Sequence, residues 1–156
     1  MKLPQNFEEF YYLAGLFFGD GDGGGNITNN HPFIHQKLEK IGEKLKIQCS
    51  IRTFKSRATR IEMGGITLKK TLGNLFDYPE KKKSRNIKIS PLLEISPKSC
   101  IAAFIRGYMD ADGTVEIGRS AVSVSSVSNE FLNKLQLLLY KFDVGSILNR
   151  KKGVLY

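Results

Sequence analysis

The sequence predicts an α+β fold in which two related halves lie in one chain of 156 residues. Two apolar helical segments each end in Asp-Gly, at residues 11–21 and, 92 positions later, at residues 104–113. Strand-like segments and a second amphipathic helix follow each of them. Each half is therefore expected to have an αββαββα-like order, and the repeat indicates a pseudo-twofold axis between the halves.

The first half is predicted to begin with a helix over residues 7–20. Asn6 is a suitable N-cap, and Glu9 lies three residues later, as in a capping box. The glycines that follow end this helix, and NITNN at 26–30 resembles the end of a short strand. Pro32 then opens an amphipathic helix, because proline is favoured in the first turn and the apolar residues recur at helical spacing.

Three further segments complete the first half. Residues 49–63 have the pattern of a hairpin, and residues 67–76 that of a helix. Residues 79–91 form a basic segment bounded by prolines, which is typical of a connector.

The second half repeats this order. Ser96 and Pro97 are expected to be the N-cap and first-turn residues of a helix that reaches Asp112. A helix with apolar residues at the same spacing follows at 129–144, and a last hairpin begins in 145–156.

The hairpin between these two helices is predicted at residues 114–128. Its residues alternate, with Val122 and Val124 on one face and Ser123 and Ser125 on the other. Strict alternation is typical of a half-buried strand, so the two serines are expected to face away from the core.

Small residues four positions apart occur in both Asp-Gly helices. They are Gly15 and Gly19 in the first helix and Gly107 and Ala111 in the second, while Arg106 is expected to face away from the contact. Such residues leave a flat patch on each helix. The two helices are therefore predicted to pack backbone to backbone.

Asp20 and Asp112 end the two helices, so the predicted packing brings two carboxylates to the same end of the interface. Neighbouring carboxylates repel one another, and a divalent cation relieves that repulsion. Oxygen ligands favour magnesium, which also binds phosphates, so this pattern indicates phosphodiester hydrolysis. The alternative is that each Asp-Gly pair is an ordinary turn at a helix end.

The charge of the chain limits its partners. A formal net charge of +9 favours a polyanion, most simply nucleic acid, although a lysine-rich solvated surface is the alternative. No apolar run approaches the length of a membrane helix, and the N-terminus has no signal-peptide core. A cytoplasmic protein that acts on genomic DNA is expected, without a membrane or a small-molecule substrate.

The two helical motifs resemble those of the LAGLIDADG homing endonucleases. LAGLFFGDG at 13–21 matches the start of that signature, and IRGYMDADG at 105–113 matches its end. The resemblance implies two antiparallel, saddle-shaped sheets that lie along the DNA major groove and are joined by the paired motif helices. Two motifs in one chain resemble the monomeric members, which make double-strand breaks with cohesive 3′ overhangs and are usually encoded within introns or inteins.

The resemblance also implies roles for individual residues. Asp20 and Asp112 would be catalytic and would bind Mg²⁺, with Gly19 and Ala111 beside them. Mn²⁺ or Ca²⁺ would be able to replace Mg²⁺ in binding. The contact between the helices would be made by Gly15, Gly19, Gly107 and Ala111.

Residues 1–95 are expected to form one half with the basic connector, and residues 96–156 the other. The glycine-rich segment after Asp20 is too short for a full first hairpin. The second half stops where the first continues through a strand and a helix, which indicates that it is incomplete. Hairpin and connector side chains are the candidates for DNA contacts: Arg52, Lys55, Arg57, Arg60, Lys82, Lys83, Arg119, Ser123, Ser125, Arg150 and Lys151.

The sequence favours a site-specific double-stranded DNA endonuclease, which is expected to be encoded by an intron. Two alternatives remain open: an RNA maturase that assists intron splicing, and a non-catalytic DNA-binding protein. An intein is disfavoured, because the chain has neither the nucleophilic first residue nor the terminal His-Asn of a self-splicing protein.

Overall fold

A computed structural model describes residues 7–54, 59–81, 83–118, 120–149 and 152–156. The elements of the first half are α1 (Phe7–Asp20), β1 (Asn26–Thr28), α2 (Pro32–Leu45), β2 (Cys49–Thr53), β3 (Thr59–Met63) and α3 (Gly65–Phe76). The connector contains two short helices, α4 (Lys83–Asn86) and α5 (Pro91–Ile95). The elements of the second half are α6 (Lys98–Asp112), β4 (Gly113–Glu116), β5 (Ala121–Ser125), α7 (Asn129–Tyr140), β6 (Leu148–Asn149) and β7 (Val154–Leu155).

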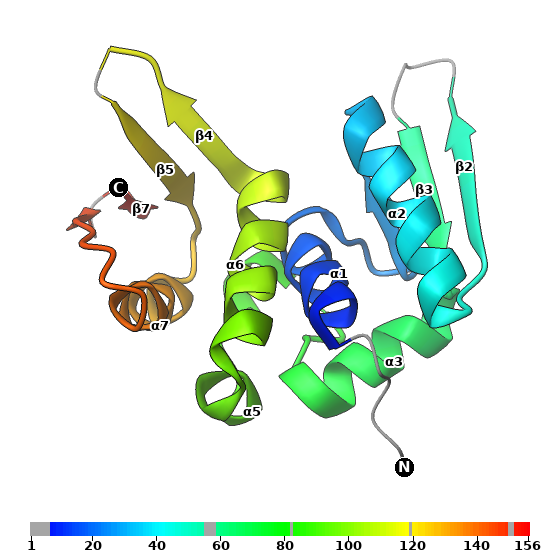
Figure 1. Cartoon of the computed structure of the whole chain (residues 1–156), viewed down its shortest axis with the longest axis horizontal. Coiled ribbons are helices and arrows are strands. Elements are labelled where there is room, and N and C mark those ends of the chain that lie inside the picture. Colours follow the sequence, from blue (N-terminus) through cyan, green and yellow to red (C-terminus); the bar gives the residue numbers. More distant parts are fainter. Residues whose placement is uncertain (1–6, 55–58, 82, 119, 150–151) are drawn as a thin grey trace.

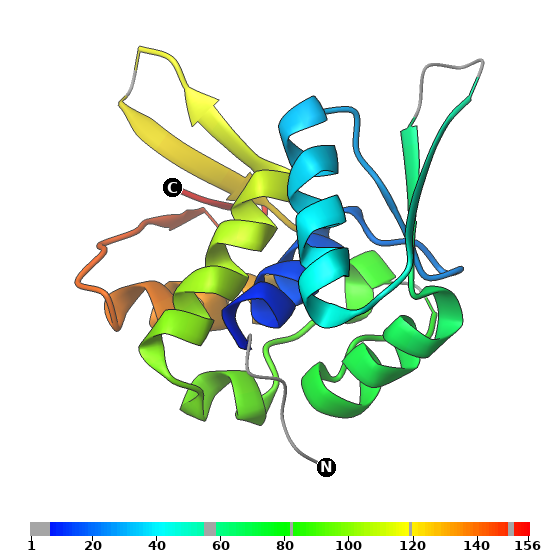
Figure 2. The same ribbon diagram turned by 45° about the vertical axis from the view of Figure 1, so that its right-hand side comes forward.

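The helices α1 and α6 lie side by side at the centre of the molecule, as both views show (Figures 1 and 2). On one side of this pair lie α2, α3 and a sheet with strand order β1-β3-β2. On the other side lie α7 and a sheet with strand order β4-β5-β7-β6. This arrangement confirms the predicted α+β fold with two antiparallel sheets joined by paired helices.

The two sheets differ in their first strand. In the second half, β4 pairs with β5 over four residue pairs, from Gly113 opposite Val124 to Glu116 opposite Ala121. In the first half, the corresponding pairing is a single bridge between Gly21 and Ile27. The glycine-rich segment is indeed too short for a full hairpin, as the sequence indicated.

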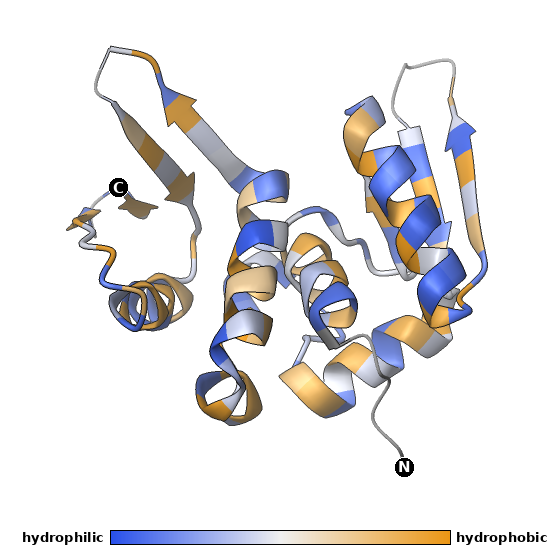
Figure 3. Cartoon of the chain, in the orientation of Figure 1, coloured by the Kyte–Doolittle hydropathy of each residue, from blue (hydrophilic) through white to orange (hydrophobic). Residues whose placement is uncertain are grey.

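Aromatic side chains from both halves form the core around α1 and α6. Phe18 of α1 contacts Phe104 of α6 at 5.2 Å between ring centroids, and Tyr108 of α6 contacts Phe131 of α7 at 4.7 Å. All four side chains are at most 1% exposed. Figure 3 shows apolar and polar residues alternating around α2, which buries Ile34, Leu38 and Ile41 against this core.

Three expectations from the sequence need correction. The connector and its C-terminal end hold two short helices that were not predicted, α4 and α5, and Ser90 caps α5 with its hydroxyl. The following helix begins one residue later than predicted, with Pro97 itself as the N-cap residue. Val122 is 52% exposed, whereas Val124 on the same face is 1% exposed, because only the base of the β4–β5 hairpin reaches the core.

Within the described ranges, none of the helices is long and apolar enough to cross a membrane.

Candidate active site

The contact between α1 and α6 depends on two glycines. A Cβ atom on Gly15 would lie 2.0 Å from the carbonyl oxygen of Phe104, and one on Gly107 would lie 2.1 Å from that of Tyr12. Both distances are far below van der Waals contact, so only glycine fits at these positions. Nearer the helix ends, a Cβ on Gly19 would lie 2.3 Å from Cβ of Ala111.

This close approach brings Asp20 and Asp112 together at the C-terminal ends of the two helices. A Cβ on Gly19, the neighbour of Asp20, would lie only 3.2 Å from Oδ2 of Asp112. Two acids at helix C-termini oppose the helix dipoles as well as each other. Such an arrangement costs stability. Ordinary turns at the two helix ends would not require two neighbouring carboxylates, so the arrangement favours a functional site.

The pKa values of both carboxyl groups are raised. The principal cause is desolvation in each case, and for Asp20 the charge of Asp112 raises the pKa further. A hydrogen bond of 2.7 Å from Asn29 Nδ2 to Asp20 Oδ2 partly counters this effect. Both acids are therefore poorly compensated by the protein alone, which is typical of groups that bind a cation.

Lys83 supplies a third charged group to this site. Its Nζ donates a hydrogen bond to the carbonyl oxygen of Gly19, and the charges of Asp112, Asp20 and Asp22 act on it. Desolvation nevertheless lowers the pKa of Lys83. From the sequence, Lys83 was one of three connector lysines predicted to contact DNA or lie near the scissile phosphates, because nothing in the basic run KKKSR distinguishes one lysine from the next.

The residues present fit a magnesium ion better than a metal that needs a complete protein cage. In the ranges that the structure describes, no group of three His, Cys, Asp or Glu side chains could hold a metal. Two carboxylates are few ligands, but Mg²⁺ keeps several waters and uses substrate phosphates to complete its coordination. The raised pKa values of Asp20 and Asp112 are consistent with a site whose charge is balanced on binding.

The raised pKa of Asp112 predicts how stability depends on pH in the absence of metal. Between the ordinary and the raised pKa, the folded chain holds more protons than the unfolded chain, so stability falls as pH rises through this window. Asp112→Asn removes the titrating group. In EDTA, its melting temperature is expected to exceed that of the wild type at pH 8. The difference should shrink as the pH falls through the raised pKa and vanish only below the ordinary pKa of an aspartate. Thermal denaturation across this range tests the prediction, and a constant difference would contradict it.

The predicted DNA contacts fall into different environments. Arg52 and Arg60 face each other across β2 and β3, with side chains 67% and 44% exposed. Ser125 is exposed, but Ser123 is only 6% exposed and donates to Glu116 at 2.9 Å, so its hydroxyl is not on the surface. The other candidates lie outside the described residues: Lys55, Arg57, Lys82, Arg119, Arg150 and Lys151.

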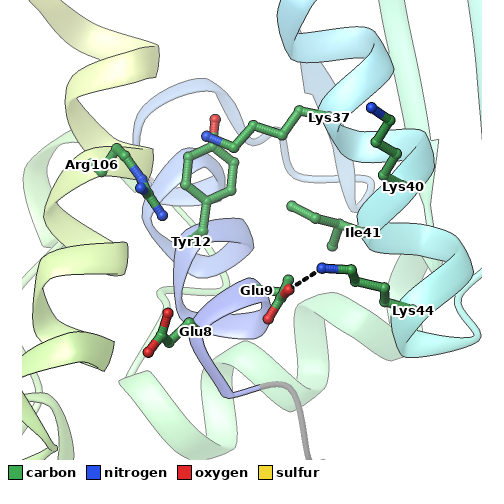
Figure 4. Close-up of a pocket in the computed structure, with 8 residues that line it drawn as sticks. All are labelled: Glu8, Glu9, Tyr12, Lys37, Lys40, Ile41, Lys44 and Arg106. Atoms are coloured by element: carbon green, nitrogen blue, oxygen red, sulfur yellow. Dashed lines mark hydrogen bonds and ion pairs between the residues drawn. The ribbon is translucent and has the colours of Figure 1, made fainter.

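A hollow of about 230 Å³ between α1, α2 and α6 was not predicted (Figure 4). Lys37 lies 3.5 Å above the ring of Tyr12 and pairs with Asp110 at 3.4 Å, while the Tyr12 hydroxyl donates to Asp110 at 2.7 Å. At the other end, Lys44 pairs with Glu9 at 2.5 Å, the contact drawn as a dashed line in Figure 4. These two ion pairs link α2 to α6 and α2 to α1, so contacts along the hollow help to hold the three helices together.

Comparison with known proteins shows which proteins share this fold. Residues 99–156 match the sequence profile of the LAGLIDADG-like domain. The chain has the fold of I-DmoI, solved in complex with DNA and Mn, with a TM-score of 0.66 and 16% identity over 96% of this chain and 87% of that one. It also matches the N-terminal LAGLIDADG domain of DUF199/WhiA, with a TM-score of 0.62 and 18% identity over 99% of this chain and 78% of that one.

Relatives by sequence are much longer proteins. The chain is 46% identical to Elongation factor 2 of Methanopyrus kandleri over 98% of its own length but 12% of the relative. It is 35% identical to a probable translation initiation factor IF-2 of Thermococcus kodakarensis, over 96% of this chain and 13% of the relative. It is 25% identical to the RNA polymerase subunit Rpo1C of Methanocaldococcus jannaschii, over 97% of this chain and 18% of the relative.

The motif helices, their glycine contact, the profile match over the second half and the fold of the whole chain agree. The chain therefore has the LAGLIDADG fold, with a LAGLIDADG-like domain at residues 99–156 and a motif helix in each half.

Proposed function

We propose that the chain is a metal-dependent, site-specific endonuclease of double-stranded DNA. The observation that carries this proposal is the convergence of Asp20 and Asp112, both with raised pKa, at one end of a glycine-packed helix pair. A fold without catalytic purpose would gain stability by replacing either acid with a neutral residue. I-DmoI, which has this fold, was solved in complex with DNA and Mn.

Asp20 and Asp112 would hold the divalent ion, which we propose to be Mg²⁺. When bound, such an ion polarises the scissile phosphate, lowers the pKa of an attacking water and stabilises the leaving oxygen. The carboxylates fix the position of the site, and Asn29 holds the Asp20 carboxylate in one orientation by its 2.7 Å hydrogen bond. One chain supplies both acids, so we propose that it acts as a monomer.

The exposed face of the first sheet would contribute to DNA binding. Arg52 and Arg60 are directly opposite each other on neighbouring strands, where like charges destabilise a sheet. Each pairs with an acid, at 3.6 Å to Glu62 and 3.4 Å to Asp22. The phosphates of a DNA duplex bound on this face of the sheet would neutralise both arginines. Arginine side chains are also able to read guanine edges.

Lys83 would stabilise the negative charge that develops on the phosphate during hydrolysis. Its ammonium donates to the carbonyl oxygen of Gly19, and its charge lowers the pKa of both Asp20 and Asp112, so removing Lys83 takes away a cation that acts on both acids. Lys83→Met is expected to lower the cleavage rate by roughly 10²–10³-fold while DNA affinity changes little. Single-turnover cleavage and a gel-shift titration in Ca²⁺ measure the two effects.

Lys81→Met is the matched control for this variant, because Lys81 belongs to the same basic run but is exposed. It should cleave at the wild-type rate. Equal losses in both variants would mean that the run acts only through its overall charge.

The genetic setting that we propose is an intein and not an intron. The matched relatives are a translation factor, an initiation factor and an RNA polymerase subunit, yet each matches through a segment of 12–18% of its length. A segment shared by proteins of such different names is most simply an inserted element. The sequence disfavoured an intein because of the first and last residues of this chain, but these residues are uninformative when the chain matches only 12–18% of the length of each relative.

A cleavage assay tests the proposed function. Purified protein is incubated with a plasmid library of randomised sites and with uninterrupted genes for the relatives, in Mg²⁺ or in EDTA. Linear products with cohesive 3′ overhangs, formed only in Mg²⁺, are expected. Metal-independent binding without any cut product would indicate a non-catalytic DNA-binding protein instead.

A further inference from the structure

The hydroxyl group of Tyr108 is a buried polar group beside the candidate site. Tyr108 is 0% exposed, and within the described residues its hydroxyl oxygen is buried without a hydrogen-bond partner. The ring packs edge-on against Phe131 at 4.7 Å between centroids, which holds the oxygen in one place. A buried hydroxyl without a partner costs stability, and phenylalanine would make the same ring contacts without that cost.

This hydroxyl lies beside the second carboxylate of the candidate site. Tyr108, Asp112 and Ser126 line one hollow of about 290 Å³. The pKa of Tyr108 is raised, first by burial and then by the negative charge of Asp112. Interaction of the hydroxyl with the Ser126 side chain lowers this pKa, and interaction with the Asp112 side chain raises it further and lowers the pKa of Asp112. The hydroxyl is therefore close enough to interact with Asp112, and a small movement of either side chain would form a hydrogen bond.

The internal repeat shows what this hydroxyl replaces. In the first half, Asn29 uses both ends of its amide: Oδ1 accepts from the backbone N–H of His31 at 2.8 Å, and Nδ2 donates to Asp20. Ser126 is its counterpart 97 residues later, and its hydroxyl accepts from the N–H of Ser128 at 3.2 Å. Serine repeats the first contact, but it is too short to repeat the second.

Tyr108 stands where the first half has Leu16, in the register that aligns the two motif helices. In the second half, Ser126 is too short to reach Asp112, and the motif helix has the Tyr108 hydroxyl. In the first half, Asn29 reaches Asp20, and the motif helix has leucine at the corresponding position. The two features compensate each other.

We propose that Tyr108 is a positioning residue for Asp112, donating its hydroxyl hydrogen to that carboxylate when metal and DNA are bound. This inference rests on the proposed nuclease function and adds to it that the two halves orient their acids by different donors. The two strands of the duplex are related by a twofold axis, so each acid lies nearer to one of the two scissile phosphates. Loss of the Tyr108 hydroxyl is expected to affect one strand more than the other.

The test uses Tyr108→Phe on a supercoiled plasmid that carries the cleaved site, with each strand labelled separately. One strand should be cut roughly 10–100-fold more slowly, so that nicked plasmid accumulates, while the other strand is cut at close to the wild-type rate. Tyr78→Phe is the matched control, because the Tyr78 hydroxyl is also buried without a partner in the described chain. It should leave both rates unchanged.

Two further measurements separate positioning from a structural role. Without metal, Tyr108→Phe should melt at or above the wild-type temperature, but Ca²⁺ should raise its melting temperature less than that of the wild type. The double variant Tyr108→Phe/Ser126→Asn gives the second half the donor that Asn29 provides in the first, and it should recover much of the lost rate.

Equal slowing of both strands, or a slow strand accompanied by a lower melting temperature without metal, would overturn the positioning role. Wild-type rates in Tyr108→Phe would overturn it as well. Failure of the wild type to cut any DNA would overturn the proposed function itself, which distinguishes the two failures.

Discussion

Replacing either Asp20 or Asp112 by asparagine is expected to abolish DNA cleavage. Asparagine has nearly the same size, but its neutral amide is a poor ligand for Mg²⁺ and cannot balance the charge of the ion. Because each half supplies one of the two acids, each single variant should lower the rate of double-strand cleavage by ~10³-fold or more.

DNA binding should survive in both variants, since it depends on side chains such as Arg52 and Arg60 that lie on the first sheet. The removal of a negative charge near phosphate should, if anything, raise the affinity. Cleavage is measured on end-labelled duplex under single-turnover conditions, and affinity by gel shift in Ca²⁺. Retention of cleavage in both single variants would show that the pair is not the catalytic centre.

Replacing Gly107 by alanine is expected to destabilise the protein severely. The new Cβ would lie 2.1 Å from the carbonyl oxygen of Tyr12, which is backbone in the middle of α1 and has little freedom to move. The two helices would have to separate, and the close contact between α1 and α6 would be lost. The expected cost is about 3 kcal/mol or more, a large share of the stability of a domain of this size.

Gly145→Ala is the control for this variant. Gly145 is exposed, its φ is not in the left-handed region, and no described atom lies within 4 Å of the position that a Cβ would take. Urea denaturation should give a free energy of unfolding close to the wild-type value for Gly145→Ala and a much lower one for Gly107→Ala. Similar stability of both variants would mean that the helices do not touch at Gly107.

Regular elements of this chain were largely predictable from local patterns. The helix at Phe7–Asp20 has the expected bounds, and α2 and α7 bury the residues that recur at helical spacing. These helices can be predicted from the sequence because one apolar face at a period of 3.6 residues is enough to define an amphipathic helix. The short helix α5 was missed, since five residues are too few to establish a period.

The internal repeat, read from the sequence alone, determined the most important feature of the site. Two small-residue helices that each end in an acid predicted a close helix contact with two carboxylates at one end, and the structure has this arrangement. Periodicity and the size of a side chain are local properties, so a single sequence is enough to predict this helix contact.

Only the tertiary structure selected Lys83 from its basic run, brought Asn29 to Asp20 and placed the Tyr108 hydroxyl beside Asp112. It also buried Ser123 and exposed Val122, against the simple alternation of the strand. The physical reason is that these environments are set by groups far away in the chain, such as Gly19 for Lys83 at a separation of 64 residues. A local pattern specifies which face of an element a residue occupies, but the partner that meets that face is chosen by packing.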